Sequence, residues 1–227
     1  MAHKIFVTGT GTDVGKTYVT GLIVKKLHEA GLSAGYFKAA VSGNDRDNSG
    51  NLIPGDAKFV KDISGISQPL ETMCPYIYER AVSPHLASRI EGNPVRMDVV
   101  KSGFESVASA YDYVTMEGSG GILCPISYND EKIMLEDVIK ELGLSTILIA
   151  DAGLGTINSV VLTVEYMRSK DIPVKVIIFN NYIEGDVMQE DNLKMCEEMT
   201  GLKVIARVES GATEIDIDID TLINLYE

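Results

Sequence analysis

A loop rich in glycine and threonine decides the fold: Thr8-Gly9-Thr10-Gly11-Thr12-Asp13-Val14-Gly15-Lys16-Thr17. It follows the apolar residues 5–8, which predict a strand, and opens residues 16–30, which predict a helix. Free backbone N–H groups at a helix start and the helix dipole attract anions, and glycines let the backbone approach them closely. In such a loop Lys16 reaches the β- and γ-phosphates and the Thr17 hydroxyl binds Mg²⁺. The loop therefore predicts a nucleotide site.

The glycine spacing of this loop departs from the common G-x-x-x-x-G-K-T pattern. That pattern places its first glycine at position 10, where this chain has Thr10, and the glycines here are Gly9 and Gly11. Partitioning and targeting ATPases carry an additional early lysine, whose place is taken by Gly11. The chain also has no Asn-Lys-x-Asp motif for reading guanine. These differences disfavour a partitioning ATPase and a guanine-specific site. The alternative without chemistry is a Gly/Thr-rich turn before a helix.

Strand and helix patterns alternate along the chain. Strands are predicted at residues 5–8, 33–38, 113–117, 145–151, 174–180 and 203–208, several as near-continuous apolar runs typical of parallel strands buried on both faces. Helices are predicted at residues 16–30, 56–63, 84–91, 98–109, 135–142, 157–170, 185–200 and 220–226, and a long polar loop at 41–54. This alternation predicts an α/β fold: a single doubly wound, mostly parallel sheet with helices on both faces, in one P-loop NTPase-like domain over residues 1–227.

Charge and composition narrow the range of partners. The chain has 33 acidic and 20 basic residues, a formal net charge of −13, and its basic residues do not cluster, so no nucleic-acid partner is expected. No apolar run approaches the roughly 18 residues of a membrane span, and the N-terminus leads directly into the first strand, so no membrane partner is expected. Cys74, Cys124 and Cys196 stand at unrelated spacings, which indicates free thiols and a cytoplasmic location.

Three charged residues are candidates for the site, and two of them, Glu117 and Lys38, end predicted strands, where ligands bind in open parallel sheets. Glu117 ends the strand 113–117, ahead of Gly118-Ser119-Gly120-Gly121, and its carboxylate could complete a Mg²⁺ site with Thr17. Asp56 is a second candidate metal ligand, or alternatively a helix N-cap. Lys38 ends the strand 33–38 and could hold a carboxylate or a transferring phosphoryl group, or it could be an ordinary surface lysine.

Four segments resemble the dethiobiotin synthetase family, and in register they cover nearly the whole chain; a fifth segment matches more weakly. Residues 9–17 are similar to the family's G-T-D-T-x-V-G-K-T, which has the same displaced glycine. The others are Gly35-Tyr36-Phe37-Lys38-Ala39-Ala40-Val41-Ser42-Gly43, Ser83-Pro84-His85-Leu86-Ala87, Glu117-Gly118-Ser119-Gly120-Gly121 and, more weakly, Gly153-Leu154-Gly155-Thr156-Ile157-Asn158. The chain differs from the family at Gly11, where Asp is usual, and at Asp13, where Glu is common.

The resemblance implies an ATP-dependent ligase of biotin synthesis that uses Mg²⁺, with 7,8-diaminononanoate and CO₂ as substrates. The diamine takes up CO₂ as a carbamate, whose oxygen attacks the γ-phosphate of ATP. The second amine then closes on the mixed anhydride and gives a cyclic urea. Lys16 and Lys38 are the implied catalytic residues, Lys38 contacting the carbamate and phosphate.

The remaining site residues are also implied by the resemblance. Thr17, Asp56 and Glu117 correspond to the metal positions, and Ser42 and Thr12 to the substrate. The implied ATP-binding residues are Asp13, Val14, Gly15, Lys16, Thr17, Tyr18, Asp56, Glu117, Gly118, Ser119, Gly120, Asn180, Asn181, Val208, Glu209 and Ser210, with the last five at the base. Gly153, Gly155 and Asn158 would come from the neighbouring subunit of a homodimer and meet the carboxylate of the substrate's tail.

Three other functions remain open at this point. A related amide-forming ligase of cobalamin synthesis shares the P-loop domain, but it is far longer and carries a glutaminase domain with a nucleophilic cysteine. A partitioning or maturation ATPase would act as an interaction switch, and Gly11 speaks against it. A nucleotide-binding module without chemistry would leave Lys38 and Glu117 without a purpose.

Overall fold

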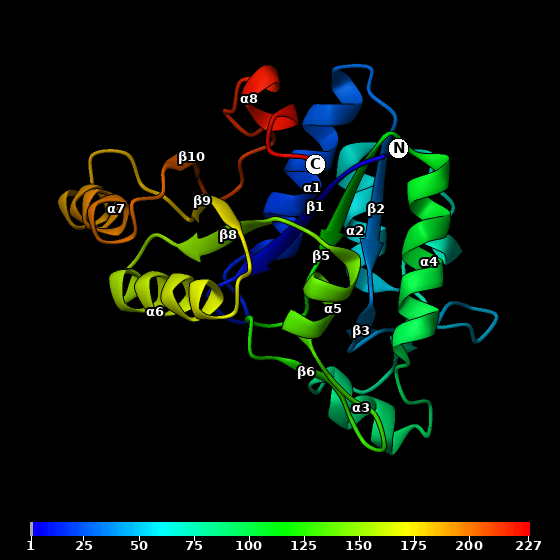
Figure 1. The fold of residues 1–227 in the computed structure, drawn as a ribbon. Helices are drawn as coiled ribbons and strands as arrows, with labels where there is room; N and C mark the ends of the chain where they lie inside the picture. The colour runs from blue at the N-terminus through cyan, green and yellow to red at the C-terminus, as the bar shows by residue number, and fades with distance from the viewer. Residues whose placement is uncertain (1) are drawn as a thin grey trace.

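The central element of the computed structural model, which describes residues 2–227, is a six-stranded sheet (Figure 1). Its strands are β1 (His3–Gly9), β2 (Ala34–Lys38), β5 (Tyr113–Glu117), β8 (Thr146–Asp151), β9 (Val174–Asn180) and β10 (Val204–Val208). They lie in the order β10-β9-β8-β1-β5-β2, and every neighbouring pair is parallel. The six strands predicted from the apolar runs are therefore confirmed.

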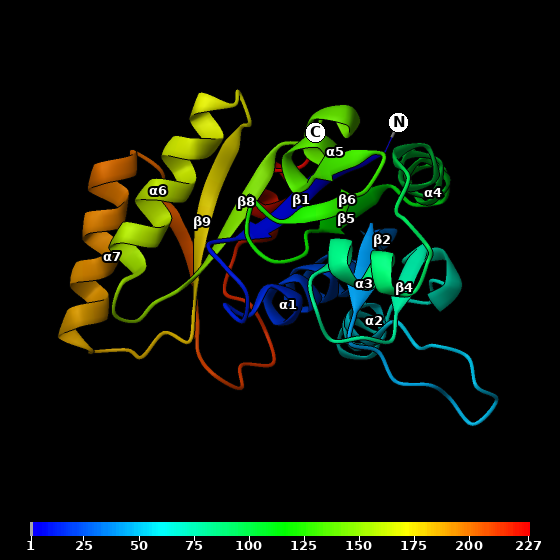
Figure 2. The same cartoon turned by 90° about the horizontal axis from the view of Figure 1, so that it is seen from below.

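Helices cover both faces of this sheet, as the alternation of strands and helices predicted. On one face α1 (Lys16–Glu29), α2 (Gly55–Ser64) and α8 (Ile219–Ile223) pack against Ile5, Val7 and Ile149. On the other face, α4 (Met97–Ala110) and α5 (Leu135–Leu142) cover the half around β5, and α6 (Thr156–Ser169) and α7 (Val187–Thr200) cover the half around β9 (Figure 2). Alternate strand residues point to opposite faces, so strands buried on both sides must be apolar throughout.

The sequence pattern did not predict four short strands. β3 (Ala40–Ser42) pairs with β4 (Tyr76–Tyr78), and β6 (Pro125–Tyr128) pairs with β7 (Lys132–Met134). A strand of three or four residues is too short for a periodic pattern, and β3 and β4 are brought together only by the fold. The predicted loop 41–54 is therefore wrong at Val41 and Ser42, which belong to β3. The rest of that stretch extends away from the sheet (Figure 2).

Near the C-terminus the helix boundaries differ from the prediction. α7 begins at Val187 instead of residue 185, because the Asp186 carboxylate caps the helix by accepting from the Gln189 N–H at 2.9 Å. α8 ends at Ile223, and Tyr226 packs into the core instead of continuing the helix. α3 (Pro84–Ile90) and the 3-10 turn Leu70–Thr72 complete the elements of the described chain.

The strand order brings three functional segments to one edge of the sheet. β5 lies between β1 and β2, with Glu117 in register with Val7 of β1 and Lys38 of β2. The carboxyl ends of parallel strands meet at the same edge, which is where such sheets bind ligands. The topology therefore places Glu117 between the glycine-rich loop after β1 and the lysine that ends β2.

None of the helices over residues 2–227 has both the length and the apolar character needed to cross a lipid bilayer.

Candidate active site

The glycine-rich loop wraps tightly at the start of α1. Gly15 is the helix N-cap, with φ of 86°, and a Cβ atom there would lie 2.0 Å from Nδ2 of Asn180. Only glycine suits both this left-handed backbone and this contact. The Lys16 ammonium donates to the Gly11 carbonyl at 2.7 Å. Burial, and then the nearby positive charge of Lys38, lower the pKa of Lys16.

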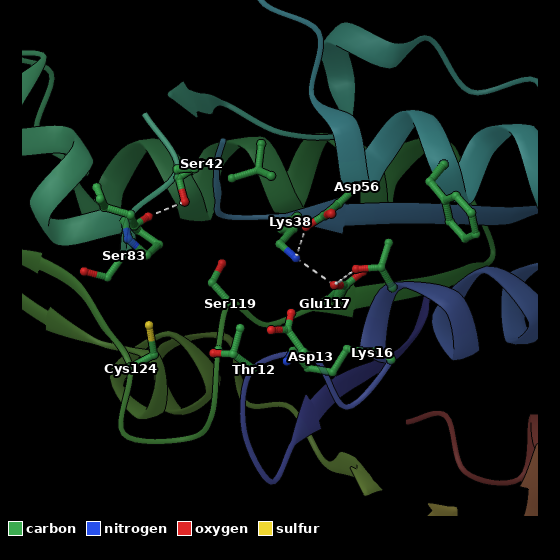
Figure 3. A pocket seen from close by; sticks show the side chains of 18 of the residues that line it. Thr12, Asp13, Lys16, Lys38, Ser42, Asp56, Ser83, Glu117, Ser119 and Cys124 are labelled. Carbon is green, nitrogen blue, oxygen red and sulfur yellow. Dashed lines mark hydrogen bonds and ion pairs between the residues drawn. The ribbon is translucent and has the colours of Figure 1, made fainter. Parts of the chain in front are cut away.

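Beside this loop, two carboxylates hold the ammonium of Lys38 (Figure 3). Lys38 Nζ lies 2.6 Å from Oδ2 of Asp56 and 2.6 Å from Oε1 of Glu117. The Thr17 hydroxyl donates to the same Glu117 oxygen at 2.7 Å. These contacts join α1, α2, β2 and β5 at one point, next to the phosphate-binding loop.

The surroundings of Lys38 and Asp56 decide two alternatives left open by the sequence. Only 3% of Lys38 is exposed, so the surface-lysine interpretation is wrong. Burial alone would lower the pKa of Lys38, but Glu117 and Asp56 beside it outweigh that effect and hold the pKa above its ordinary value. Asp56 is not an N-cap, because Pro54 occupies that position and the Asp56 carboxylate lies instead on Lys38.

Tyr36 is a member of this cluster to which sequence reasoning gave no role. Its hydroxyl donates to Oε2 of Glu117 at 2.8 Å, and its side chain is fully buried. Burial and the Glu117 charge raise the pKa of Tyr36 well above its usual range, so the phenol stays protonated and remains a donor. The sequence offered only part of the signal, because Tyr36 stands two residues before Lys38 on one strand and therefore on the same face. The register with β5, which brings Tyr36 to Glu117, comes from the fold.

The oxygen atoms in this cluster suit a magnesium ion. Mg²⁺ prefers hard oxygen ligands and is typically held by one or two carboxylates, with water and substrate phosphate completing its shell. Thr17, Asp56 and Glu117 supply a hydroxyl and two carboxylates around one point. Within residues 2–227 no group of three or more His, Cys, Asp or Glu side chains is arranged to enclose a metal by itself. The residues therefore fit an ion that shares its coordination with a phosphate ligand.

These groups open into a cleft of about 1020 Å³. Of the predicted site residues, those that line it are Thr12, Asp13, Gly15, Lys16, Thr17, Tyr18, Lys38, Ser42, Asp56, Glu117, Ser119 and Gly120. The wall opposite the loop is formed by residues 81–84, and the Ser42 hydroxyl donates to the Val82 carbonyl at 2.5 Å (Figure 3). The cleft thus extends from the phosphate loop past Lys38 to Ser42.

The predicted base contacts lie at the other side of the loop. Asn180 ends β9, and its Nδ2 donates to the Val14 carbonyl at 3.1 Å, while Oδ1 is buried without a partner in the described chain. Val208 ends β10 in register with Asn180, and Glu209 and Ser210 follow it on the surface. Asn181 turns away and donates to Asp151 at 2.7 Å. The fold therefore brings Val14, Asn180 and Val208 together, whereas the Asn181 side chain contacts Asp151 instead.

The remaining predicted residues lie outside the cleft of their own chain. Gly153 and Gly155 form the turn between β8 and α6, with Gly155 as the helix N-cap, and Asn158 is exposed on the first turn of α6. Gly118 continues from β5, and its N–H donates to the Val7 carbonyl at 2.9 Å.

A glycine-rich loop at a helix start, with a buried lysine and magnesium-type oxygen ligands at the end of the neighbouring strand, defines a P-loop nucleotide-binding protein. Solved structures agree with this fold. The MinC:MinD cell division complex of Aquifex aeolicus matches with a TM-score of 0.57 at 14% identity, covering 98% of this chain and 86% of that one. FtsY of Thermotoga maritima matches with a TM-score of 0.54 at 13% identity, covering 99% and 68%.

Sequence comparison identifies the family within this class. A family model described as an AAA domain matches residues 3–213. The protein named ATP-dependent dethiobiotin synthetase BioD of Brachyspira hyodysenteriae is 50% identical over 95% of this chain and 96% of its own length. The protein of that name from Clostridium botulinum strain Loch Maree is 45% identical over 100% and 99%. The chain belongs to the ATP-dependent dethiobiotin synthetase family.

Proposed function

We propose that this chain converts 7,8-diaminononanoate, CO₂ and ATP into dethiobiotin, ADP and phosphate, with Mg²⁺ bound beside the nucleotide. As a member of its family the chain is an ATP-dependent ligase of biotin synthesis. The observation that carries the chemical proposal is the placement of Lys38. Its ammonium lies among Asp56, Glu117 and Thr17, beside the phosphate loop and in the cleft that reaches Ser42.

The reaction proceeds in three bond-forming steps. One amine of the substrate attacks CO₂ and loses a proton, which gives a carbamate. A carbamate oxygen attacks the γ-phosphorus while the bond to ADP breaks, which gives a carbamic–phosphoric anhydride. The second amine attacks the carbonyl carbon of this anhydride, phosphate leaves, and loss of a proton completes the cyclic urea.

The residues of the cleft supply positioning and charge. Lys16 binds the β- and γ-phosphates, and Lys38 lies where charge develops on the carbamate and the transferring phosphoryl group. Thr17, Asp56 and Glu117 would hold the metal, which when bound neutralises charge on the phosphates. Ser42 presents a hydroxyl at the far side of the cleft and contacts the carbamate. Phosphoryl transfer needs little covalent help from the protein, so a site built of cations and hydroxyls suffices.

The proposed adenine site rests on an orphaned acceptor. Oδ1 of Asn180 is buried and has no partner among the described residues, which is costly unless a ligand donates to it. The exocyclic amine of adenine is such a donor. Guanine presents a carbonyl oxygen at that position, so Asn180 supports a preference for ATP.

Product analysis tests the proposed function directly. The purified chain is incubated with ATP, Mg²⁺ and bicarbonate, with and without 7,8-diaminononanoate, and the products are identified by mass. We expect ADP and a cyclic urea to form only in the presence of the diamine. If ATP is hydrolysed at the same rate with and without the diamine and no cyclic urea forms, the proposal is ruled out.

Asp56→Asn tests the metal assignment. We expect the Mg²⁺ concentration for half-maximal activity to rise at least about tenfold, because the ion loses an anionic ligand. Asp62→Asn on the same helix is the matched control, since Asp62 is exposed and forms a salt bridge with Lys58. A metal requirement that is unchanged in Asp56→Asn, or equally raised in both variants, would make Asp56 structural.

We also propose that the functional unit is a homodimer in which the turn before α6 completes the neighbouring site. Gly153 and Gly155 do not line their own cleft, and Leu154 between them is 91% exposed. Two further exposed apolar residues are Ile183, in the loop before α7, and Val187, the first residue of α7, which packs beside α6 (Figure 2). Exposed apolar side chains of this kind favour a protein interface, and free N–H groups at the start of α6 suit the tail carboxylate of the substrate.

A mixing experiment tests the shared site. Lys16→Ala is combined with a bulky replacement, Asn158→Trp, which would obstruct the proposed contact with the tail carboxylate without straining the left-handed backbone at Gly155. Each variant alone is expected to be inactive. Random exchange should restore up to about a quarter of the wild-type sites, because one site in each hybrid dimer carries neither lesion. Continued inactivity after demonstrated exchange would place the whole site within one chain.

The free thiols of the described chain, Cys74, Cys124 and Cys196, support the cytoplasmic location proposed for this enzyme.

A further inference from the structure

The Glu117 carboxylate uses its two oxygens for different purposes. Oε1 faces the cleft and accepts from the Thr17 hydroxyl at 2.7 Å and the Lys38 ammonium at 2.6 Å. Oε2 faces the protein interior and accepts from the Tyr36 hydroxyl at 2.8 Å. The side chain of Glu117 is 0% exposed, so water does not compete for either oxygen. The orientation of the carboxylate is therefore fixed by these donors.

Strand register explains why Tyr36 reaches this oxygen. Tyr36 and Lys38 lie on the same face of β2, two residues apart, and Glu117 is in register with Lys38 on the adjacent β5. The side chain of Tyr36 lies against the core that packs under α1 and α2. From there its hydroxyl reaches diagonally across the two strands to Oε2 of Glu117, the carboxylate oxygen that faces away from the cleft.

The backbone of Tyr36 is held at what is otherwise the open edge of the sheet. The Gln68 side chain is fully buried; it accepts from the Tyr36 N–H at 2.8 Å and donates to the Tyr36 carbonyl at 3.0 Å. The Gln68 amide thereby makes the hydrogen bonds that a neighbouring strand would make, because β2 is the last strand of the sheet. Because the backbone is paired on both sides and the ring is packed, Tyr36 cannot easily move to follow a rotating carboxylate.

We propose that Tyr36 is a positioning residue for the metal-binding carboxylate: its hydroxyl holds Glu117 Oε2, so that Oε1 stays directed at Thr17, Lys38 and the bound metal. The inference rests on the proposed role of Glu117 as a metal ligand. Without the hydroxyl, Oε2 would be a buried acceptor with no donor, and the carboxylate would turn about its last torsion toward another partner. That rotation would take Oε1 away from the cleft.

Tyr36→Phe is the test, because it removes only the hydroxyl and keeps the packed ring. The first readout is the Mg²⁺ dependence of product formation, where we expect the half-saturating concentration to rise about tenfold. The second is independent of turnover: Mn²⁺ is titrated by electron paramagnetic resonance into the chain with a non-hydrolysable ATP analogue, and its affinity is expected to fall by a similar factor. Binding of the same analogue in EDTA should be unchanged, since Lys16 and its loop are untouched.

Tyr226→Phe is the matched control. Tyr226 is another buried tyrosine of the same core, and its hydroxyl lies 2.7 Å from that of Thr115, two residues before Glu117 on β5. A merely structural role for Tyr36 predicts that both variants lose thermal stability and that neither changes metal affinity. We expect only Tyr36→Phe to weaken Mn²⁺ binding.

Each outcome of this experiment decides a separate point. If Tyr36→Phe binds Mn²⁺ as tightly as the wild type, or if Tyr226→Phe loses as much affinity, the positioning role is overturned. If the wild-type chain makes no cyclic urea, the proposed reaction fails, but the Mn²⁺ titration still tests Tyr36. If Tyr36→Phe weakens Mn²⁺ binding and excess Mg²⁺ restores its turnover, the inference is supported.

Discussion

Lys16→Ala is expected to lower turnover by roughly 10³-fold or more, since the β- and γ-phosphates lose their main protein cation in a site that acts by charge stabilisation. The loss should be large because Lys16 is 7% exposed and water cannot easily replace its ammonium. The measurement is kcat for diamine-dependent ADP formation, with thermal unfolding as the check on the fold.

Lys26→Ala is the control for this loss. Lys26 lies on the same helix but outside the active-site cleft, so its removal should leave kcat unchanged. Near-normal turnover in Lys16→Ala would mean that the glycine-rich loop does not hold the reacting nucleotide.

Lys38→Gln is expected to lower kcat by about 10²-fold or more while sparing ATP affinity. Glutamine can donate a hydrogen bond, but it brings no charge to the developing anion on the carbamate and phosphoryl group. The Mg²⁺ concentration for half-maximal activity should not rise as it does in Asp56→Asn. Removing Lys38 takes away a competing cation and leaves every metal ligand in place. Single-turnover kinetics with mass detection of the cyclic urea separate these effects.

Lys58→Gln is the control for this variant, because it removes an exposed ammonium that pairs with Asp62. If Lys38→Gln fails by losing nucleotide affinity at normal kcat, Lys38 belongs to ATP binding and not to the substrate.

Much of the candidate site could be predicted because three of its charged residues follow a recognisable local signal. Lys16 opens a helix after a glycine-rich loop, and Lys38 and Glu117 each end an apolar strand. A parallel sheet brings such ends to one edge, so their proximity follows from the fold class. The resemblance to a family added Asp56 and Ser42, whose own surroundings in the sequence are ambiguous.

The rest depended on contacts between segments that are distant in sequence. Gln68 follows α2 in an irregular stretch, and nothing local indicates that its amide completes the edge of β2. From the sequence alone Tyr36 is indistinguishable from an ordinary core residue, because its contact with Glu117 depends on the register between β2 and β5. The pairing of β3 with β4 joins segments more than thirty residues apart, and neither is long enough to show a period.

The contact between Gly15 and Asn180 has a consequence for engineering the nucleobase preference of this enzyme. The backbone that grips the phosphates lies directly against the side chain proposed to read the base, with no room for even a methyl group between them. Asn180 also supports the loop through the Val14 carbonyl. A larger residue at position 180, introduced to admit a different base, would therefore displace the phosphate loop as well. Recognition of the two ends of the nucleotide cannot be redesigned independently in this protein.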